Sequence, residues 1–185
     1  FYLPRQVVKE NNIKVSTSST LRLLDIFDRG VAMFLFFGHG SPNIWTDQRI
    51  WFGGDDERSD NLNLHNENRL PFVATFTCNQ GAFDYPMPPW DINISEDMMR
   101  VKGRGSIAMF VPSGPGDTAS HEIMAQGLME AIFRERLRRL GEVTALSRIY
   151  YQMRRGPENI QRMYLLLGDP ALDLVIPTAM QEGQI

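Results

Sequence analysis

Residues 31–42 read VAMFLFFGHGSP, and this stretch decides the fold class. Its first seven residues are apolar without alternation, which is typical of a strand covered on both faces in a parallel α/β sheet. Pro71–Thr77 and Ser106–Val111 have the same character, and each run ends near a glycine, a proline or a small polar residue. We therefore expect three buried strands.

Segments with helical patterns lie between and after these runs. Gly30, Gly103 and Gly141 stand where three of the helices are expected to stop. The expected helices cover residues 20–28, 95–102, 119–140, 142–154 and 158–166, and a last short strand covers 171–176. Residues 51–68 are polar and irregular and are expected to form a surface excursion. The order of these elements predicts an open α/β sandwich.

The composition bounds the class of protein. The 185 residues are 43% apolar, which is enough for one globular domain that needs no disulfide or metal to fold. The formal charge of -3 provides no concentrated positive field, which argues against nucleic acid or an anionic membrane as partner. The longest apolar run is far shorter than the about 20 residues of a membrane span. A polypeptide or a small molecule is the expected partner.

The first residues suggest that the sequence is part of something longer. Phe1 follows no initiator Met or signal peptide, and Phe-Tyr-Leu-Pro reads as the interior of a domain. Residues 1–185 are therefore expected to be one domain, a portion excised from a longer chain with further domains.

Two reactive side chains follow two of the predicted strands. His39 lies between Gly38 and Gly40 after the first strand, and Cys78 follows Thr77 after the second. Reactive groups gather at the carboxyl ends of open parallel sheets, so an imidazole and a thiol are expected to face one crevice. The imidazole could activate the thiol and later protonate a leaving amine. The N–H groups of Gly40 and Cys78 could stabilise an oxyanion.

The pattern alone also allows a structural role for both residues. Cysteine is among the most buried residue types and often fills a core. A histidine between glycines can be a turn residue. The single cysteine excludes an internal disulfide and a thiolate-cluster metal site. Spacing and residue type therefore leave the catalytic and the structural interpretation open.

Five blocks of the sequence resemble, in the same order, those of the gingipain-like cysteine peptidases. They are Leu24–Trp45 around His39, LPFVATFTCNQGAFD at 70–84 around Cys78, SEDMMR at 95–100, GSIAMF at 105–110 and LLGDPALDL at 166–174. Five blocks in register over nearly the whole chain are a specific signal.

The resemblance implies a caspase-like three-layer α/β/α sandwich with a mostly parallel sheet. It also implies endopeptidase chemistry through an acyl-enzyme thioester, with no cofactor and outside the cytoplasm, in a secreted or cell-surface protein. By matching position, His39 and Cys78 take the catalytic roles, and the N–H groups of Gly40 and Cys78 form the oxyanion hole. An acidic residue well upstream often orients the histidine in this family, and this sequence begins too late to include it.

The loop at 113–117 follows the third predicted strand. In the resembling family this loop helps to wall the pocket for the residue that precedes the cleaved bond, which makes Ser113, Gly114 and Asp117 candidate substrate-binding residues. The small residues at positions 116, 118 and 119 depart from the aromatic walls of some members. A preference for Arg or Lys is therefore not carried over.

The remaining polar candidates have structural explanations. His65 lies in a solvated stretch, and His121 follows a probable helix start, where capping or packing is expected. Asp169 is expected to bond within a turn. The acidic run at 55–57 could bind calcium, but three consecutive carboxylates lack regular spacing, so a solvated loop is favoured and no metal is expected.

Two other functions compete with hydrolysis. A sortase-like transpeptidase would form the same thioester and resolve it with an amine in place of water. A catalytically silent protein-binding module of a large secreted protein would need neither reactive residue, and the retention of both His39 and Cys78 weighs against it.

Overall fold

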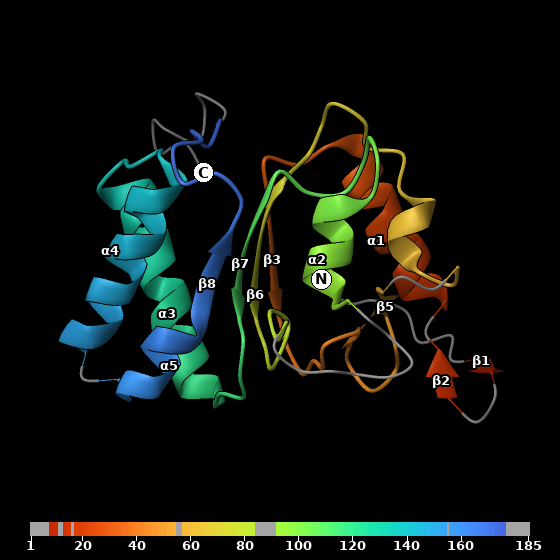
Figure 1. Cartoon of the computed structure of the whole chain (residues 1–185), viewed down its shortest axis with the longest axis horizontal. Coiled ribbons are helices and arrows are strands. Elements are labelled where there is room, and N and C mark those ends of the chain that lie inside the picture. Colours follow the sequence, from red (N-terminus) through yellow and green to blue (C-terminus); the bar gives the residue numbers. More distant parts are fainter. Residues whose placement is uncertain are drawn as a thin grey trace.

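The computed structural model describes residues 8–10, 13–15, 17–54, 57–83, 92–154 and 156–176. A sheet lies between two layers of helices (Figure 1). In the described part of the chain its strand order is β3 (Met33–Phe37), β6 (Phe72–Phe76), β7 (Ala108–Pro112) and β8 (Tyr164–Leu167). β3, β6 and β7 are parallel, and β8 runs antiparallel to β7.

The helices divide between the two faces of the sheet (Figure 1). One face is covered by α1 (Thr17–Arg29) and α2 (Ile94–Arg100), and the other by α3 (Thr118–Met129), α4 (Leu140–Met153) and α5 (Glu158–Met163). The expected three-layer sandwich with a mostly parallel sheet is confirmed. Two small hairpins pair β1 (Val8–Glu10) with β2 (Ile13–Val15) and β4 (Ile44–Trp45) with β5 (Trp51–Phe52).

The central strand β6 explains why its sequence shows no alternation. Phe72, Ala74 and Phe76 belong to the apolar core beneath α3 and α4. Val73, between them, belongs to the core on the side of α1. Successive side chains of a strand point to opposite faces, so a strand covered on both faces is apolar throughout.

The expected long helix over 119–140 was wrong. α3 ends at Met129, a π-helical turn covers Glu130–Arg134, and α4 begins at Leu140. Gly141 therefore does not stop a helix but lies in the first turn of one. Its N–H donates to the carbonyl oxygen of Pro170 at 2.9 Å, and a Cβ at this position would lie 2.9 Å from the Pro170 ring. The glycine reflects a close approach of two segments.

The expected strand over 171–176 was also wrong. Sequence analysis extended the helix of 158–166 too far, because α5 ends at Met163 and Tyr164–Leu167 forms β8. A short apolar run fits a helix or a strand equally well, and here the free edge of β7 favours the strand. Residues 171–176 instead lie beside the first turn of α4. The carbonyl oxygen of Leu172 accepts a hydrogen bond from the N–H of Leu140 at 2.9 Å.

The stretch 51–68 is less exposed than expected. Trp51 and Leu64 are fully buried. Asp97 of α2, itself buried, accepts hydrogen bonds from Ser59 Oγ at 2.5 Å and Asn61 Nδ2 at 2.6 Å. A buried carboxylate requires such donors, so the excursion is fastened to α2 instead of lying loosely on the surface.

Candidate active site

The carboxyl edge of the sheet brings together the two segments that hold His39 and Cys78. Phe37 and Phe76 are partners in the parallel register of β3 and β6, and their rings stack with centroids 4.6 Å apart. Beyond them, the N–H of Gly38 donates to the carbonyl oxygen of Phe76 at 3.4 Å. His39 lies two residues after Phe37, and Cys78 lies two residues after Phe76.

His39 stands at the start of a narrow hairpin turn. The carbonyl oxygen of His39 accepts from the N–H of Thr46 at 2.9 Å, and Gly40 forms a β-bridge with Trp45. The His39 side chain is exposed. A Cβ on Gly40 would collide with the hydroxyl of Thr77, so only glycine lets this turn touch the residue that precedes Cys78.

Gln80 ties the two segments together, and sequence analysis missed it. Its side-chain oxygen accepts from Trp45 Nε1 at 2.6 Å, and its nitrogen donates to the carbonyl oxygen of Ser41. Its own backbone carbonyl accepts from Ser95 Oγ at 2.7 Å. Gln80 is fully buried, two residues after Cys78. Its position two residues after Cys78 is the only sequence signal for this role.

Cys78 is half-buried beside the loop 113–117. Its sulfur lies 3.6 Å from the carbonyl oxygen of Gly116, within reach of a weak S–H hydrogen bond. The next residue, Asn79, has φ of 60°, a left-handed conformation that asparagine tolerates better than most residues. The N–H of Asn79 donates to the carbonyl oxygen of Gly114 at 3.2 Å. The loop predicted to contact substrate is thus next to the thiol.

The three predicted substrate-binding residues lie in this loop with distinct structural tasks. The N–H of Ser113 donates to the carbonyl oxygen of Met163 at 2.8 Å, and Gly114 packs directly on the Met163 side chain. Asp117 is the N-cap of α3, and its carboxylate accepts from the N–H and the hydroxyl of Ser120 at 2.9 and 2.6 Å. These hydrogen bonds lower the pKa of Asp117. Contact of the three residues with substrate stays a prediction, as does the oxyanion role of Gly40 and Cys78.

A buried polar pair lies close to the thiol. His121 Nδ1 is 2.6 Å from the hydroxyl of Tyr164. Burial, with smaller contributions from negative charge on Cys78 and Tyr151, raises the pKa of Tyr164 well above its usual range. Sequence analysis assigned His121 to capping or packing, and its burial confirms packing. It missed Tyr164, which it had placed within a helix.

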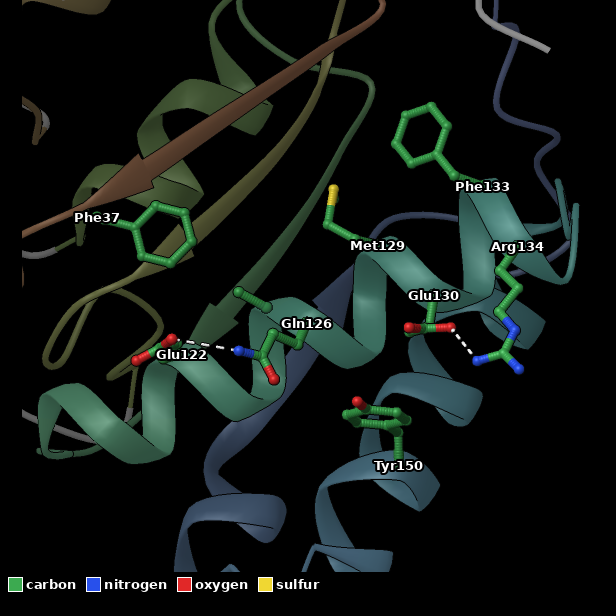
Figure 2. Close-up of a pocket in the computed structure, with 9 residues that line it drawn as sticks. Phe37, Glu122, Gln126, Met129, Glu130, Phe133, Arg134 and Tyr150 are labelled. Atoms are coloured by element: carbon green, nitrogen blue, oxygen red, sulfur yellow. Dashed lines mark hydrogen bonds and ion pairs between the residues drawn. The ribbon is translucent and has the colours of Figure 1, made fainter. Parts of the chain in front are cut away.

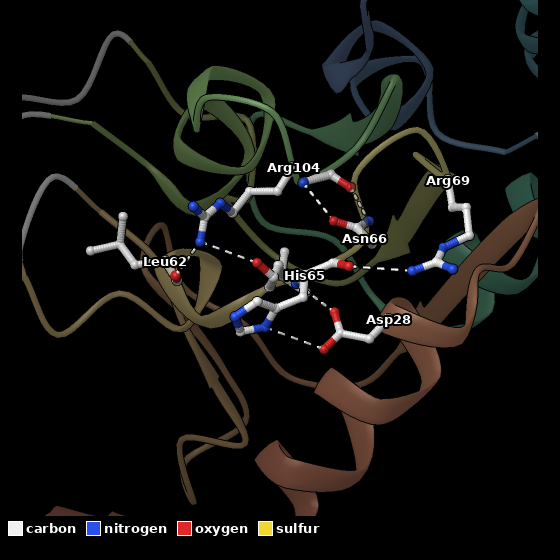
Figure 3. A network of polar contacts seen from close by, with 8 residues as sticks. Asp28, Leu62, His65, Asn66, Arg69 and Arg104 are labelled. Atoms are coloured by element: carbon white, nitrogen blue, oxygen red, sulfur yellow. Dashed lines mark hydrogen bonds and ion pairs between the residues drawn. The ribbon is translucent and has the colours of Figure 1, made fainter.

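The other two polar candidates lie away from this edge. His65 is exposed and faces Asp28, near the end of α1 that leads into the start of β3, with Nδ1 3.6 Å from the carboxylate (Figure 3). Its backbone carbonyl accepts from Arg69 at 3.3 Å in the same network. Asp169 accepts from the N–H of Ala171 at 2.8 Å, which confirms its expected role in a turn.

The acidic run at 55–57 stays without a structural account. Asp55 and Asp56 lie outside the described residues, so the calcium alternative is untested. Among the residues that the structure describes, no cluster of three or more His, Cys, Asp or Glu side chains could hold a metal. In the same part of the chain, none of the helices has the length and apolar character to cross a bilayer.

A pocket of about 470 Å³ lies beside the end of β3. Figure 2 shows the ring of Phe37 directed toward α3 at one end of it and Phe133 at the other. Glu122 and Glu130 contribute carboxylates to its wall. Phe37 is 54% exposed, although it is the last residue of the apolar strand β3. The continuous apolar run gave no indication of this exposed ring.

The chain matches known proteins along most of its length. The family model described as Peptidase family C25 matches residues 2–175. Gingipain R2 of Porphyromonas gingivalis is 26% identical over 172 aligned residues, which cover 86% of this chain and 22% of that protein. Gingipain R1 of the same species is also 26% identical, with 86% of this chain and 16% of that protein covered. The chain thus spans about a fifth of the length of these curated relatives.

Solved structures share the fold. The crystal structure of the Arg-specific cysteine proteinase gingipain R aligns with a TM-score of 0.73 and 23% identity, covering 84% of this chain and 36% of that one. A complex of the pro- and mature domains of a Porphyromonas gingivalis gingipain aligns with a TM-score of 0.70 and 23% identity, covering 84% of this chain and 37% of that one. Because the family model spans nearly all of the sequence, the chain belongs to peptidase family C25.

Proposed function

We propose that this chain carries the catalytic centre of a cysteine endopeptidase, with Cys78 as nucleophile and His39 as general acid and base. One observation carries the proposal: the two residues follow at equivalent positions after the register pair of Phe37 and Phe76. Neighbouring strands lie about 4.8 Å apart, so two side chains at equivalent positions beyond a pair begin within reach of each other. Family membership supports the same assignment.

The first half of the reaction would form a thioester. His39 takes the proton of the Cys78 thiol, and the thiolate sulfur attacks the carbonyl carbon of a peptide bond. The N–H groups of Gly40 and Cys78 would donate to the oxygen that becomes negative. Collapse of the tetrahedral intermediate breaks the C–N bond, and the imidazolium returns its proton to the leaving amine.

The second half would release the acyl group. A water molecule, deprotonated by His39, attacks the thioester and regenerates the thiol. An amine in place of water would give a new peptide bond, as in a sortase-like transpeptidase, with no change in the protein groups required. Ser113, Gly114 and Asp117 would border the residue that precedes the cleaved bond, because their loop adjoins the Cys78 sulfur. The resemblance to gingipains also leads us to propose a location outside the cytoplasm.

The direct test uses the full-length protein and a mixture of peptides analysed by mass spectrometry. Native protein should cleave peptides, and C78S should lose at least about a thousandfold in rate, because removal of a nucleophile eliminates the covalent route. An added amine distinguishes the two fates of the thioester, since a ligated product indicates transfer.

The controls test whether the C78S protein folds and whether the native protein is catalytically inactive. Circular dichroism of the C78S protein should match that of the native protein, because one small side-chain atom replaces another. Cleavage that survives in C78S refutes the proposal. Absence of any cleavage by the native protein, together with a thiol that reacts only after denaturation, would favour a silent binding module.

A further inference from the structure

His121 is a buried histidine with a defined protonation state. Its side chain is in the first turn of α3, and the residue is 5% exposed. Burial keeps the pKa of Tyr164 high, so the phenol retains its proton and can donate it to His121 Nδ1, which lies 2.6 Å away. Burial also lowers the pKa of His121, which keeps the ring neutral near pH 7. A neutral imidazole that accepts at Nδ1 carries its hydrogen on Nε2.

That Nε2–H group is the unusual feature. Nε2 is buried and has no partner within the usual distance and angle limits in the part of the chain that the structure describes, although the Gly116 carbonyl is near enough to favour a protonated ring. Gly116 is its close neighbour: a Cβ on Gly116 would lie 2.8 Å from Nε2. A buried donor without a partner is destabilising, so its retention here needs an explanation.

The Gly116 backbone that Nε2 faces also contacts the Cys78 thiol. The carbonyl oxygen of Gly116 lies 3.6 Å from the Cys78 sulfur and accepts its S–H. When that proton leaves, a negatively charged sulfur is left facing a carbonyl oxygen without a donor. Two electron-rich atoms at this distance repel each other, and a new donor to the oxygen would relieve the repulsion.

We propose that His121 is a positioning residue that donates from Nε2 to the Gly116 carbonyl oxygen when the Cys78 thiol gives up its proton. The inference rests on the proposed role of Cys78 as nucleophile. In the proposed reaction, and in labelling of the substrate-free protein, the thiol proton moves to His39. His121 neither gains nor loses a proton, and Tyr164 fixes the tautomer that makes the donation available.

The charged and titratable groups around the pair are consistent with a neutral ring. Burial has the largest effect on the pKa of His121 and favours the neutral ring, whereas Asp117 and the Gly116 carbonyl favour the protonated ring. Burial raises the pKa of Tyr164 and keeps the phenol protonated, and negative charge on Cys78 or on Tyr151 of α4 raises this pKa further. His121 therefore acts here as a fixed donor and not as a base.

The test measures iodoacetamide labelling of Cys78 against pH in the full-length protein. His121→Leu removes the donor, and His121→Gln retains an amide N–H that can reach the same carbonyl. The Leu variant should label about tenfold more slowly near pH 7, with its profile moved to higher pH, since a tenfold change corresponds to about 1.4 kcal/mol, the size of one hydrogen bond. The Gln variant should stay within about threefold of the native rate.

A second variant covers the case in which the Leu protein does not fold. Tyr164→Phe keeps the ring of the tyrosine but frees the tautomer of His121, and it should slow labelling by an intermediate amount. Tyr151→Phe is the matched control, because it removes a buried phenol hydroxyl from α4 and leaves His121 with its partner. It should label like the native protein.

The outcomes separate the two proposals. Equal slowing by Leu and Gln, or slowing by Tyr151→Phe, would mean that packing alone matters and would overturn the inference. Fast native labelling that none of the His121 and Tyr164 variants changes would overturn it while leaving the proposed peptidase intact. Native labelling with the profile of an ordinary thiol would refute the proposed function and the inference together.

Discussion

The Cys78 sulfur lies 3.6 Å from the carbonyl oxygen of Gly116, and this contact joins the end of β6 to the loop that follows β7. The thiol is therefore held between two strand ends. His39 follows β3, which pairs with β6 on the side opposite to β7. The carboxyl edge of the sheet thus collects one segment from each of the three parallel strands.

The first prediction concerns thiol reactivity. An ordinary thiol has a pKa of about 8.5 and is mostly protonated near pH 7, so it labels slowly with iodoacetamide. Cys78 should label readily at this pH, and His39→Ala should slow the reaction by about tenfold or more, because the proton acceptor is removed. His65→Ala is the matched control, since this exposed histidine faces Asp28 away from the thiol. Equal slowing by both variants would contradict the assignment of His39.

The second prediction concerns Gln80 as the link between the two segments. Gln80→Ala leaves the indole N–H of Trp45 and the carbonyl of Ser41 without a partner. The free energy of unfolding should fall by about 1–3 kcal/mol in urea titration, and peptide cleavage should fall further than stability explains. Gln126→Ala, on the exposed face of α3, should change stability by less than about 0.5 kcal/mol. Unchanged unfolding of the Gln80 variant would contradict this prediction.

The third prediction separates two roles of Asp117. Asp117→Ala removes the cap of α3 and should cost about 1 kcal/mol of stability, whereas Asp117→Ser keeps a capping oxygen and should cost only a few tenths. If the carboxylate also binds substrate, Asp117→Ser should raise KM while the melting temperature stays the same. If KM rises only in the variant whose melting temperature falls, Asp117 acts as a helix cap and does not bind substrate.

The pH dependence of this cap has a definite sign. The hydrogen bonds from Ser120 lower the folded-state pKa of Asp117 below that of the unfolded chain. The stabilisation is therefore complete above the unfolded value of about 3.9 and is lost as the pH falls through the folded value. Acid titration of the Asp117→Ala variant should lack this contribution.

The fourth prediction concerns Asp60. Burial raises its pKa to about 6, against the opposing effects of the Phe52 N–H and of Arg49. The stabilisation from the protonated form is complete below about pH 4 and is lost as the pH rises toward 6. Asp60→Asn should therefore be more stable than the native protein at pH 7, by up to about 2 kcal/mol, with little difference at pH 4. Urea unfolding at both values measures this.

The control for Asp60 is an exposed aspartate of the β4–β5 turn. Asp47→Asn should leave the free energy of unfolding at pH 7 within about 0.5 kcal/mol of the native value, because Asp47 is exposed. An Asp60→Asn protein that gains nothing at pH 7 would show that burial does not disfavour the charged carboxylate.

The sequence predicted the central strands and the places where they end well. Buried parallel strands give long apolar runs, and the glycines around His39 mark where the first run ends. The same property hid β8, because the apolar run of Tyr164–Leu167 is short and continues a helical pattern. Its strand pairing depends on the free edge of β7, which is a property of the sheet and not of the local sequence.

The parts of the site that sequence analysis missed depend on contacts between distant segments. Gln80 and Trp45 are separated by 35 positions, and His121 and Tyr164 by 43. The residue type of a buried glutamine or histidine does not indicate which distant residue will be its hydrogen-bond partner. Their roles appear only when the strands bring these segments together.

The parallel pairing of β3 with β6 has a kinetic consequence. Residues 38–71 must close into a loop before Phe37 can meet Phe76, and such non-local pairing is slow compared with the formation of helices. During refolding, fast thiol labelling that depends on His39 should therefore return with the sheet and lag behind the recovery of helical circular dichroism. No early, locally ordered intermediate would have the ends of β3 and β6 side by side, so the proposed peptidase activity would be absent from a partly folded chain.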